Sequence, residues 1–289
     1  MNLVFNRKLS GIAIMIFAMF IMTIMDAAVK WLVSDYSIQQ INFIRSIVAM
    51  IVLLPQVYID GGLSAFKTSN KKIHLWRVFL MLVISYSWFY ALGKMGLAEI
   101  GALVMVSPLF ITILTPLLLK ESVSKKKWFA VLFGFFGMLV IMRPGFEVFR
   151  PISILPASVA LGYALLLISN RSNRETETLT SLVYYPLFGI FIFSLFLLPF
   201  GWITPSFVDL SIMFFIGFCG GIGHFCLTLA FRYASPPTLA PLEYTGLLWA
   251  ILLGYLIFRE TPDIWTIIGM LLITGAGFSV IKREKEIER

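Results

Sequence analysis

Charge is scarce in this chain, and the residues that most catalytic centres require are scarcer still. Only 13% of the 289 residues are charged, whereas soluble domains average about 25%. The two histidines, His74 and His224, are too far apart for a zinc-binding HExxH helix. Gly93-Lys94 is followed by Met95 rather than Ser or Thr, so there is no Walker A loop, and no serine stands in a nucleophile elbow. These absences argue against an enzyme, and we expect neither a metal nor a cofactor.

Cysteine is equally rare. Cys219 and Cys226 lie in one apolar segment and form no metal-binding or disulfide pattern, so we expect buried, inert thiols. The net charge of +8 could suggest nucleic-acid binding. The basic residues lie instead at the ends of apolar segments, where charges orient a membrane protein. We therefore expect a membrane-lipid environment and no nucleic-acid partner.

Apolar residues are what the chain has in abundance. They make up 59% of it, and the mean hydropathy is +0.91. One soluble core could not hide so much apolar surface, so the chain is predicted to be an integral membrane protein. Ten apolar segments predict an all-α fold of ten transmembrane helices, near 10–33, 40–59, 75–93, 98–119, 127–143, 152–169, 180–200, 208–231, 236–257 and 263–281. The first segment runs on without a small-residue cleavage site, which speaks against a removed signal peptide.

The distribution of lysine and arginine predicts the orientation. If the N-terminus is cytoplasmic, cytoplasmic segments hold 17 of these residues and the opposite side holds 4. This asymmetry is typical of an even number of spans with both termini in the cytoplasm.

The sequence contains an internal duplication. Leu119-Lys120-Glu121 and Phe258-Arg259-Glu260 each close one apolar segment and precede another, and Gly137 and Gly277 follow their glutamates at nearly the same distance. We predict two five-helix repeats, residues 1–146 and 147–289. Because five spans are an odd number, the second repeat enters the membrane from the opposite face. Such inverted repeats are typical of secondary transporters, whose substrate site lies between the repeats.

Charged and polar residues inside the first three predicted spans are candidates for that site. Asp26 and Lys30 share one face of the first span, Arg45 lies in the second, and Ser85 and Trp88 lie in the third. One interpretation is structural: Asp26 pairs with Arg45 or Lys30, Lys30 reaches the headgroups, and Trp88 faces lipid. The other is a charged cavity wall in which Arg45 binds a carboxylate or phosphate.

The second half supplies the other candidates. Glu243 lies inside the ninth span, where a carboxylate is costly. It is either buried and neutral, bonded to His224 or Tyr163, or it binds a cation or carries a proton. His224 itself is either a packing group or a proton carrier. Tyr163 and Tyr244 are candidates for aromatic stacking surface, and Gly217 and Gly221 form a GxxxG pattern for close helix approach.

These patterns resemble the EamA family of the drug/metabolite transporter superfamily over nearly the whole chain. The resemblance is carried by Arg45, by WFYALGKMGLAEIGALVMVSPLFITILTPLLLKES from Trp88 to Ser122, by GFFGMLVIMRPG, and by GHFCLTLAFRYASPPTLAPLEYTGLLWAILLGYLIFRETPDIWTIIG. It implies ten helices in two inverted repeats, a central cavity and alternating access. The Pro-Leu-Glu-Tyr-Thr pattern looks most like the branch with bacterial S-adenosylmethionine and riboflavin carriers.

The resemblance implies a bacterial inner-membrane transporter of a small polar or zwitterionic metabolite, working as a monomer or homodimer. Arg45 would bind an anionic group, Glu243 a cationic group or a proton, and the aromatic residues a sulfonium such as that of S-adenosylmethionine. Export of amino acids or drugs, riboflavin transport and lipid flipping are the alternatives within this class. A non-transporting membrane scaffold, in which all the intramembrane charges pair internally, is the alternative of another class.

Overall fold

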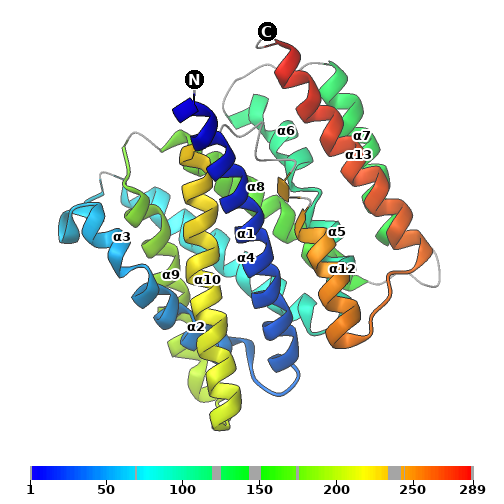
Figure 1. The fold of residues 1–289 in the computed structure, drawn as a ribbon. Coiled ribbons are helices and arrows are strands. Elements are labelled where there is room, and N and C mark those ends of the chain that lie inside the picture. Colours follow the sequence, from blue (N-terminus) through cyan, green and yellow to red (C-terminus); the bar gives the residue numbers. More distant parts are fainter. Residues whose placement is uncertain are drawn as a thin grey trace.

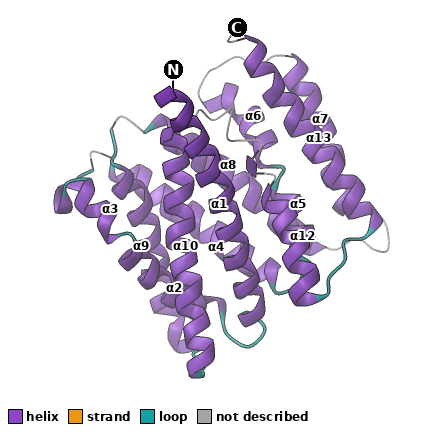
Figure 2. Cartoon of the chain, in the orientation of Figure 1, coloured by secondary structure: helices purple, strands orange, loops and turns teal. Residues whose placement is uncertain are grey.

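Helices make up all the regular structure that is described in this chain (Figure 2). The structure, a computed structural model, describes residues 2–68, 70–118, 125–142, 151–173, 176–233, 242–243 and 245–287. In its first half the helices are α1 Asn2–Leu32, α2 Ile38–Val52, α3 Leu54–Ile59, the 3-10 turn η1 Gly62–Phe66, α4 Lys71–Leu92, α5 Leu97–Val104, α6 Ser107–Leu118 and α7 Lys125–Met142. In the second half they are η2 Pro151–Ser153, α8 Ile154–Ser172, α9 Leu179–Leu197, η3 Leu198–Phe200, α10 Phe207–Tyr233, α12 Thr245–Phe258 and α13 Ile264–Ile287.

The described helices supply ten apolar spans. Five are long enough to cross a membrane by length and composition, and five shorter apolar helices, of 10 to 17 residues, accompany them. Each coincides with one of the ten segments predicted from the sequence, so the all-α membrane fold is confirmed. The fourth span differs from expectation because it is broken into α5 and α6 at Met105 and Val106. Interrupted helices of this kind are typical of the substrate region of transporters.

Helices of the first five spans pack on helices of the last five. The main neighbours are α1 with α10 and α12, α2 with α9, α4 with α8 and α9, and α5 with α12. Figure 1 shows α7 and α13 side by side at one edge, and they pack closely. Glycine allows this contact: a Cβ on Gly137 would lie 2.9 Å from the Gly269 carbonyl oxygen, and one on Gly269 would lie 2.7 Å from that of Gly137. The first and second halves of the chain therefore pack closely against each other, at this edge as well as in the centre.

Both chain ends lie at the same end of the bundle, as an even number of spans requires (Figure 1). We call this the terminal end and the opposite one the distal end. Helix α1 runs from the terminal to the distal end, so Asp26 and Lys30 lie in its distal half. The loops α1–α2, α4–α5 and α12–α13 meet at the distal end, and the loops η1–α4 and α8–α9 meet at the terminal end.

Candidate functional site

Charged groups from the first three spans meet inside the bundle. Trp88 on α4 donates its indole N–H to Asp26 Oδ1 on α1 at 2.8 Å. Arg45 on α2 interacts electrostatically with Asp26 and is only 4% exposed. Its guanidinium lies 5.3 Å from the centre of the Phe89 ring. Trp88 therefore does not face lipid: it fixes the carboxylate that opposes Arg45.

A second group of polar side chains surrounds Arg45. Asn42 Oδ1 accepts hydrogen bonds from Ser85 Oγ at 2.9 Å and from Arg45 Nη1 at 3.4 Å. Asn42 is fully buried, and its Nδ2 has no hydrogen-bond partner among the described residues, nor has Arg45 Nε. Leaving a buried donor unpaired costs about 1–3 kcal/mol. We call Asp26, Asn42, Arg45, Ser85 and Trp88 the central cluster. Two of its donors, Asn42 Nδ2 and Arg45 Nε, thus have no acceptor among the described residues.

Helix α10 approaches the central cluster through glycines. A Cβ on Gly217 would lie 2.5 Å from Val48 Cβ, and one on Gly221 would lie 3.0 Å from Val52, which confirms the close approach predicted from GxxxG. A Cβ on Gly220 would lie 3.3 Å from Arg45 Nε. His224, one turn further along α10, interacts electrostatically with Arg45. The second half of the chain thus contributes His224 to the surroundings of Arg45.

Glu243 and Tyr163 form another part of the interior. Both are half-buried, and they interact electrostatically with each other. Glu243 stands two residues before α12, which begins at Thr245. A Cβ on Gly246 would lie 3.7 Å from Met19 and 3.9 Å from Met105, at the break between α5 and α6. Tyr244, predicted as stacking surface, lies outside the described residues.

Lys30 does not pair with Asp26 as one interpretation had it. Its ammonium lies 2.9 Å from Glu260 Oε1 and donates to the carbonyl oxygens of Leu92 and Met95. Glu260 Oε2 in turn accepts the backbone N–H of Leu97 at 2.9 Å. These contacts, which we call the Glu260 junction, tie α1 and the start of α5 to the end of α12 at the distal end.

Backbone geometry places Glu260 in this junction. Arg259 has a left-handed φ of 56°, which turns the chain back at the end of α12. The N–H of Glu260 then donates to the carbonyl oxygen of Gly254 at 3.0 Å. The sequence identified Glu260 only as a repeat marker, because its partner Lys30 lies in a distant span.

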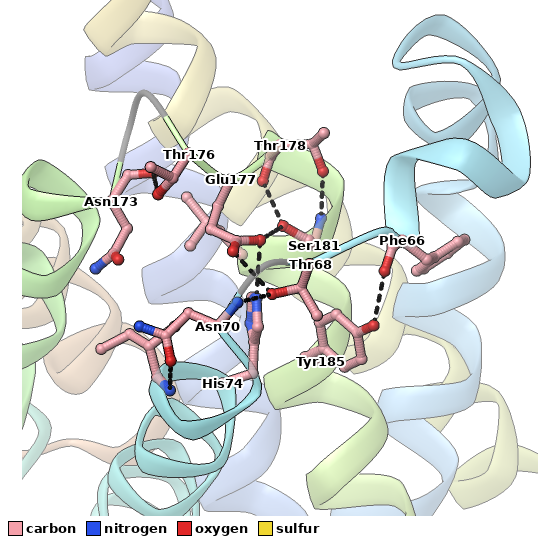
Figure 3. Close-up of polar contacts among 12 residues, drawn as sticks. Phe66, Thr68, Asn70, His74, Asn173, Thr176, Glu177, Thr178, Ser181 and Tyr185 are labelled. Carbon is pink, nitrogen blue, oxygen red and sulfur yellow. Dashed lines mark hydrogen bonds and ion pairs between the residues drawn. The ribbon is translucent and has the colours of Figure 1, made fainter.

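A different carboxylate joins the two halves at the terminal end (Figure 3). Glu177, between α8 and α9, accepts hydrogen bonds from Thr68 Oγ1 at 2.8 Å and Ser181 Oγ at 3.1 Å, and lies 3.0 Å from His74 Nε2. The His74 ring packs on Tyr185, whose hydroxyl donates to the Phe66 carbonyl oxygen. We call these contacts the Glu177 junction. Sequence reasoning missed it, because nothing in the sequence pairs these two loops.

Further polar contacts reinforce the Glu177 junction. Asp60 accepts from both the N–H and the hydroxyl of Thr180 at 3.1 and 2.8 Å. Arg77 donates to the Leu182 carbonyl oxygen at 2.8 Å. Burial by itself would raise the pKa of Glu177, but its hydrogen bonds from Thr68, His74 and Ser181 outweigh burial and hold that pKa below the ordinary value of 4.5.

A cavity of about 250 Å³ opens beside the Glu260 junction. Its walls come from α5, the end of α7, η2, α12 and the start of α13. The described residues contain no cluster of histidine, cysteine or carboxylate side chains that could hold a metal ion. Cys219 and Cys226 are free thiols; Cys219 is buried as expected, whereas Cys226 is only half-buried.

This architecture defines the class: a multi-pass membrane protein that holds ionisable groups from several spans in its interior. A profile of the EamA-like transporter family matches residues 9–143 and 151–281. The chain therefore belongs to the EamA-like transporter family, and it is a transporter rather than an enzyme. The resemblance seen in its motifs is confirmed.

Relatives with assigned substrates cover most of the chain. An S-adenosylmethionine uptake transporter of Rickettsia prowazekii is 29% identical over 286 residues, which is 99% of this chain and 97% of that protein. A riboflavin transporter of Vibrio cholerae is 27% identical over 224 residues, or 77% of this chain and 75% of the relative. One crystal structure, 15% identical, matches with a TM-score of 0.70 over 97% of this chain and 98% of that chain, a likeness of fold alone.

Proposed function

We propose that this protein is a secondary transporter that carries a small zwitterion of the S-adenosylmethionine type across the bacterial inner membrane by alternating access. The observation that carries the proposal is the central cluster, where Asp26 and Arg45 interact electrostatically without a direct ion pair, beside two buried donors that have no partner in the described part of the chain. Charges inside a membrane span are costly and usually serve a substrate or ion pathway.

The roles follow from the chemistry of the side chains. Arg45 offers a planar fork for a substrate carboxylate, and Asn42 Nδ2 adds a neighbouring donor. Asp26, Glu243 and His224 can balance a cationic group or carry a coupling proton. Aromatic faces attract sulfonium and ammonium groups, a role we assign to Trp88, Tyr163 and Tyr244.

The relatives support the substrate class. Transporters of S-adenosylmethionine and of riboflavin both match this chain. S-adenosylmethionine carries an ammonium, a sulfonium and a carboxylate, so it fits an interior with charges of both signs. We also infer that residues 1–146 and 147–289 are the two repeats and that the terminal end faces the cytoplasm, because the basic residues concentrate there.

The direct test is uptake of labelled S-adenosylmethionine into proteoliposomes, with and without a pH gradient. We expect saturable uptake by the wild type, at least a tenfold loss in Arg45→Lys, which keeps the charge but loses the fork, and a comparable loss in Glu243→Gln. Tyr90→Phe is the matched control, since Tyr90 lies on α4 two residues from Trp88 but is 49% exposed.

Other outcomes separate the alternatives. If the wild type neither takes up nor exchanges S-adenosylmethionine, that substrate is wrong, and riboflavin, amino acids and drugs are tested next. Full uptake by Arg45→Lys and Glu243→Gln would make both residues structural. A membrane scaffold would lose stability in these variants and would transport none of these compounds.

A further inference from the structure

One edge of the Arg45 guanidinium faces a glycine rather than an acceptor. Nη1 donates to Asn42 Oδ1 at 3.4 Å, and the guanidinium carbon lies over the Phe89 ring, 5.3 Å from its centre. Nε is buried and has no hydrogen-bond partner among the described residues. Nε and Nη2 share one edge of the planar group, and such an edge can donate two parallel hydrogen bonds to a carboxylate. This edge is therefore the part of Arg45 that a ligand can bind.

Gly220 on α10 lies against that edge. A Cβ added to Gly220 would lie 3.3 Å from Arg45 Nε and 3.8 Å from Arg45 Nη2. Hydrogen bonds from a guanidinium to a carboxylate measure about 2.7–2.9 Å, so a side chain at position 220 would compete for the space that an acceptor of both N–H groups needs. Glycine is the residue that lets a ligand approach the backbone so closely.

Close packing of helices does not explain Gly220 as it explains the neighbouring glycines. Cβ atoms on Gly217 and Gly221 would lie 3.0 and 3.3 Å from backbone atoms of α2. The three nearest neighbours of a Cβ on Gly220 would instead be side-chain atoms, namely Met25 Sδ at 3.1 Å and the two nitrogens of Arg45. Because glycine weakens a helix interior relative to alanine, its use at position 220 calls for another reason.

The charge of Arg45 has no carboxylate in direct contact. The side chain is 4% exposed, and among the described residues no acidic group lies within ion-pair distance of it. Asp26 interacts with Arg45 electrostatically, but its Oδ1 is bound by the Trp88 indole N–H at 2.8 Å. A buried charge needs a close counter-charge and hydrogen bonds to offset its desolvation. A carboxylate on the Nε–Nη2 edge would supply both.

We propose that Gly220 is a specificity-determining residue: it allows the carboxylate of the transported zwitterion to bind side-on to Nε and Nη2 of Arg45. The identity of the zwitterion rests on the proposed function, whereas the choice of a carboxylate rests on the shape and charge of this edge. The thioether of Met25 is flexible and shifts to make room for the bound group. Since Gly220 belongs to the second half of the chain and Arg45 to the first, the carboxylate binds between the two halves.

Two ligands that differ in the carboxylate test this proposal. Kd is measured with purified protein in detergent for S-adenosylmethionine and for its decarboxylated form, which keeps the ammonium and the sulfonium. We expect the wild type to bind the decarboxylated form at least tenfold more weakly. Gly220→Ala is expected to weaken binding of S-adenosylmethionine at least tenfold and to change that of the decarboxylated form less than twofold.

Gly101→Ala is the matched control, because its added Cβ would lie 3.5 Å or more from its neighbours, and it should leave both constants unchanged. Where Gly220→Ala does not fold, Met25→Ala/Gly220→Ala replaces it, since this variant removes the sulfur at 3.1 Å, and Met25→Ala alone is its control. A disturbance of packing alone would weaken both ligands equally, and that result overturns the proposal. Equal binding of both ligands by the wild type overturns it too.

Acetate separates this proposal from the proposed function, because it shares only the carboxylate with the substrate. Thermal unfolding is measured in sodium acetate and in sodium chloride at equal ionic strength. We expect acetate to raise the Tm of the wild type and of Gly101→Ala by about 2 °C or more, and to leave that of Gly220→Ala unchanged. If neither adenosyl ligand binds the wild type, this pattern still supports the carboxylate edge and contradicts the proposed substrate. In that case, an equal effect of acetate on wild type and Gly220→Ala, or no effect on either, overturns the edge.

Discussion

The Glu260 and Glu177 junctions use the same type of residue to join the two halves, but in different surroundings. Glu260 is held by one ammonium and one backbone N–H, is partly exposed and adjoins a cavity. Glu177 is 8% exposed and is held by three side chains, with Asp60 and Arg77 adding bonds nearby. Lys30 and Glu260 are 11% and 29% exposed, so their ion pair contributes more than a surface pair but less than a fully buried polar network, which is costly to break.

This contrast leads us to assign different roles to the two junctions. The Glu260 junction is the one that can open at modest cost, as a gate must. In the transport cycle proposed above, the Glu177 junction is the anchor that keeps η1, α4 and α9 together. The following predictions test whether the two ends differ in this way.

The largest effect is expected at the anchor. Glu177→Ala leaves the Thr68 and Ser181 hydroxyls and the His74 ring without their shared acceptor, and we expect a loss of roughly 3 kcal/mol in the free energy of unfolding. Thermal unfolding of the purified protein in detergent measures it. Thr176→Ala, an exposed neighbour, serves as the control. A loss below about 1 kcal/mol would remove the distinction between anchor and gate.

A smaller effect on stability is expected at the gate. Glu260→Gln removes the charge that attracts Lys30 but keeps an acceptor for the Leu97 N–H and leaves Lys30 bonded to two carbonyl oxygens. We therefore expect about 1–2 kcal/mol of destabilisation, less than at the anchor. The same variant should speed maleimide labelling of Leu97→Cys severalfold in a background without the native cysteines, because the Leu97 side chain is 2% exposed and becomes accessible when the distal end opens. Asp35→Asn, an exposed carboxylate on the α1–α2 loop at the same end, is the control. Unchanged labelling would mean that the ion pair does not hold this end closed.

The smallest expected effect is on the stability of the protein at acidic pH. The pKa of Glu177 is lower in the folded protein than its ordinary value of 4.5, so its contribution to stability is present above pH 4.5 and is lost as the pH falls through the folded-state pKa. We expect the stability of the wild type to decline below pH 4.5 more steeply than that of Glu177→Gln. Unfolding curves at pH 3 to 6 compare the two. Parallel curves would contradict this account of the carboxylate.

The fold was largely predictable from the sequence, because membrane spans need long apolar runs and the chain has ten. The break between α5 and α6 has a signal in Pro108 rather than in hydropathy, because proline carries no N–H to donate to the carbonyl oxygen of Val104, four residues earlier. Local hydropathy does not register a change of backbone direction inside an apolar segment.

The residues of the candidate site could be predicted from the sequence, but the contacts between their side chains could not. Asp26, Arg45, Ser85 and Trp88 were identified because polar residues in spans are costly. Their partners depend on helix packing over long sequence separations: Asp26 bonds Trp88, Ser85 bonds Asn42, and Lys30 bonds Glu260. The close approach of α10 was predicted from Gly217 and Gly221, but only the folded chain shows that it places Gly220 beside Arg45.

The most direct test of the gate and the anchor locks each in turn with a disulfide. For the gate the pair is Leu97→Cys with Gly254→Cys, since a Cβ on Gly254 would lie 3.7 Å from Leu97 Cβ, within the range of about 3.5–4.5 Å that disulfides need. For the anchor it is Asp60→Cys with Thr180→Cys, whose native side chains are hydrogen-bonded. Both pairs replace residues in a background without the native cysteines, and each single-cysteine variant is a control.

Substrate uptake is then measured in proteoliposomes after oxidation and again after reduction. The account predicts that oxidation of the gate pair stops uptake, that reduction restores it, and that oxidation of the anchor pair leaves uptake within twofold of its reduced form. Continued uptake by protein shown to be fully cross-linked at the gate would contradict the account, as would a block at the anchor.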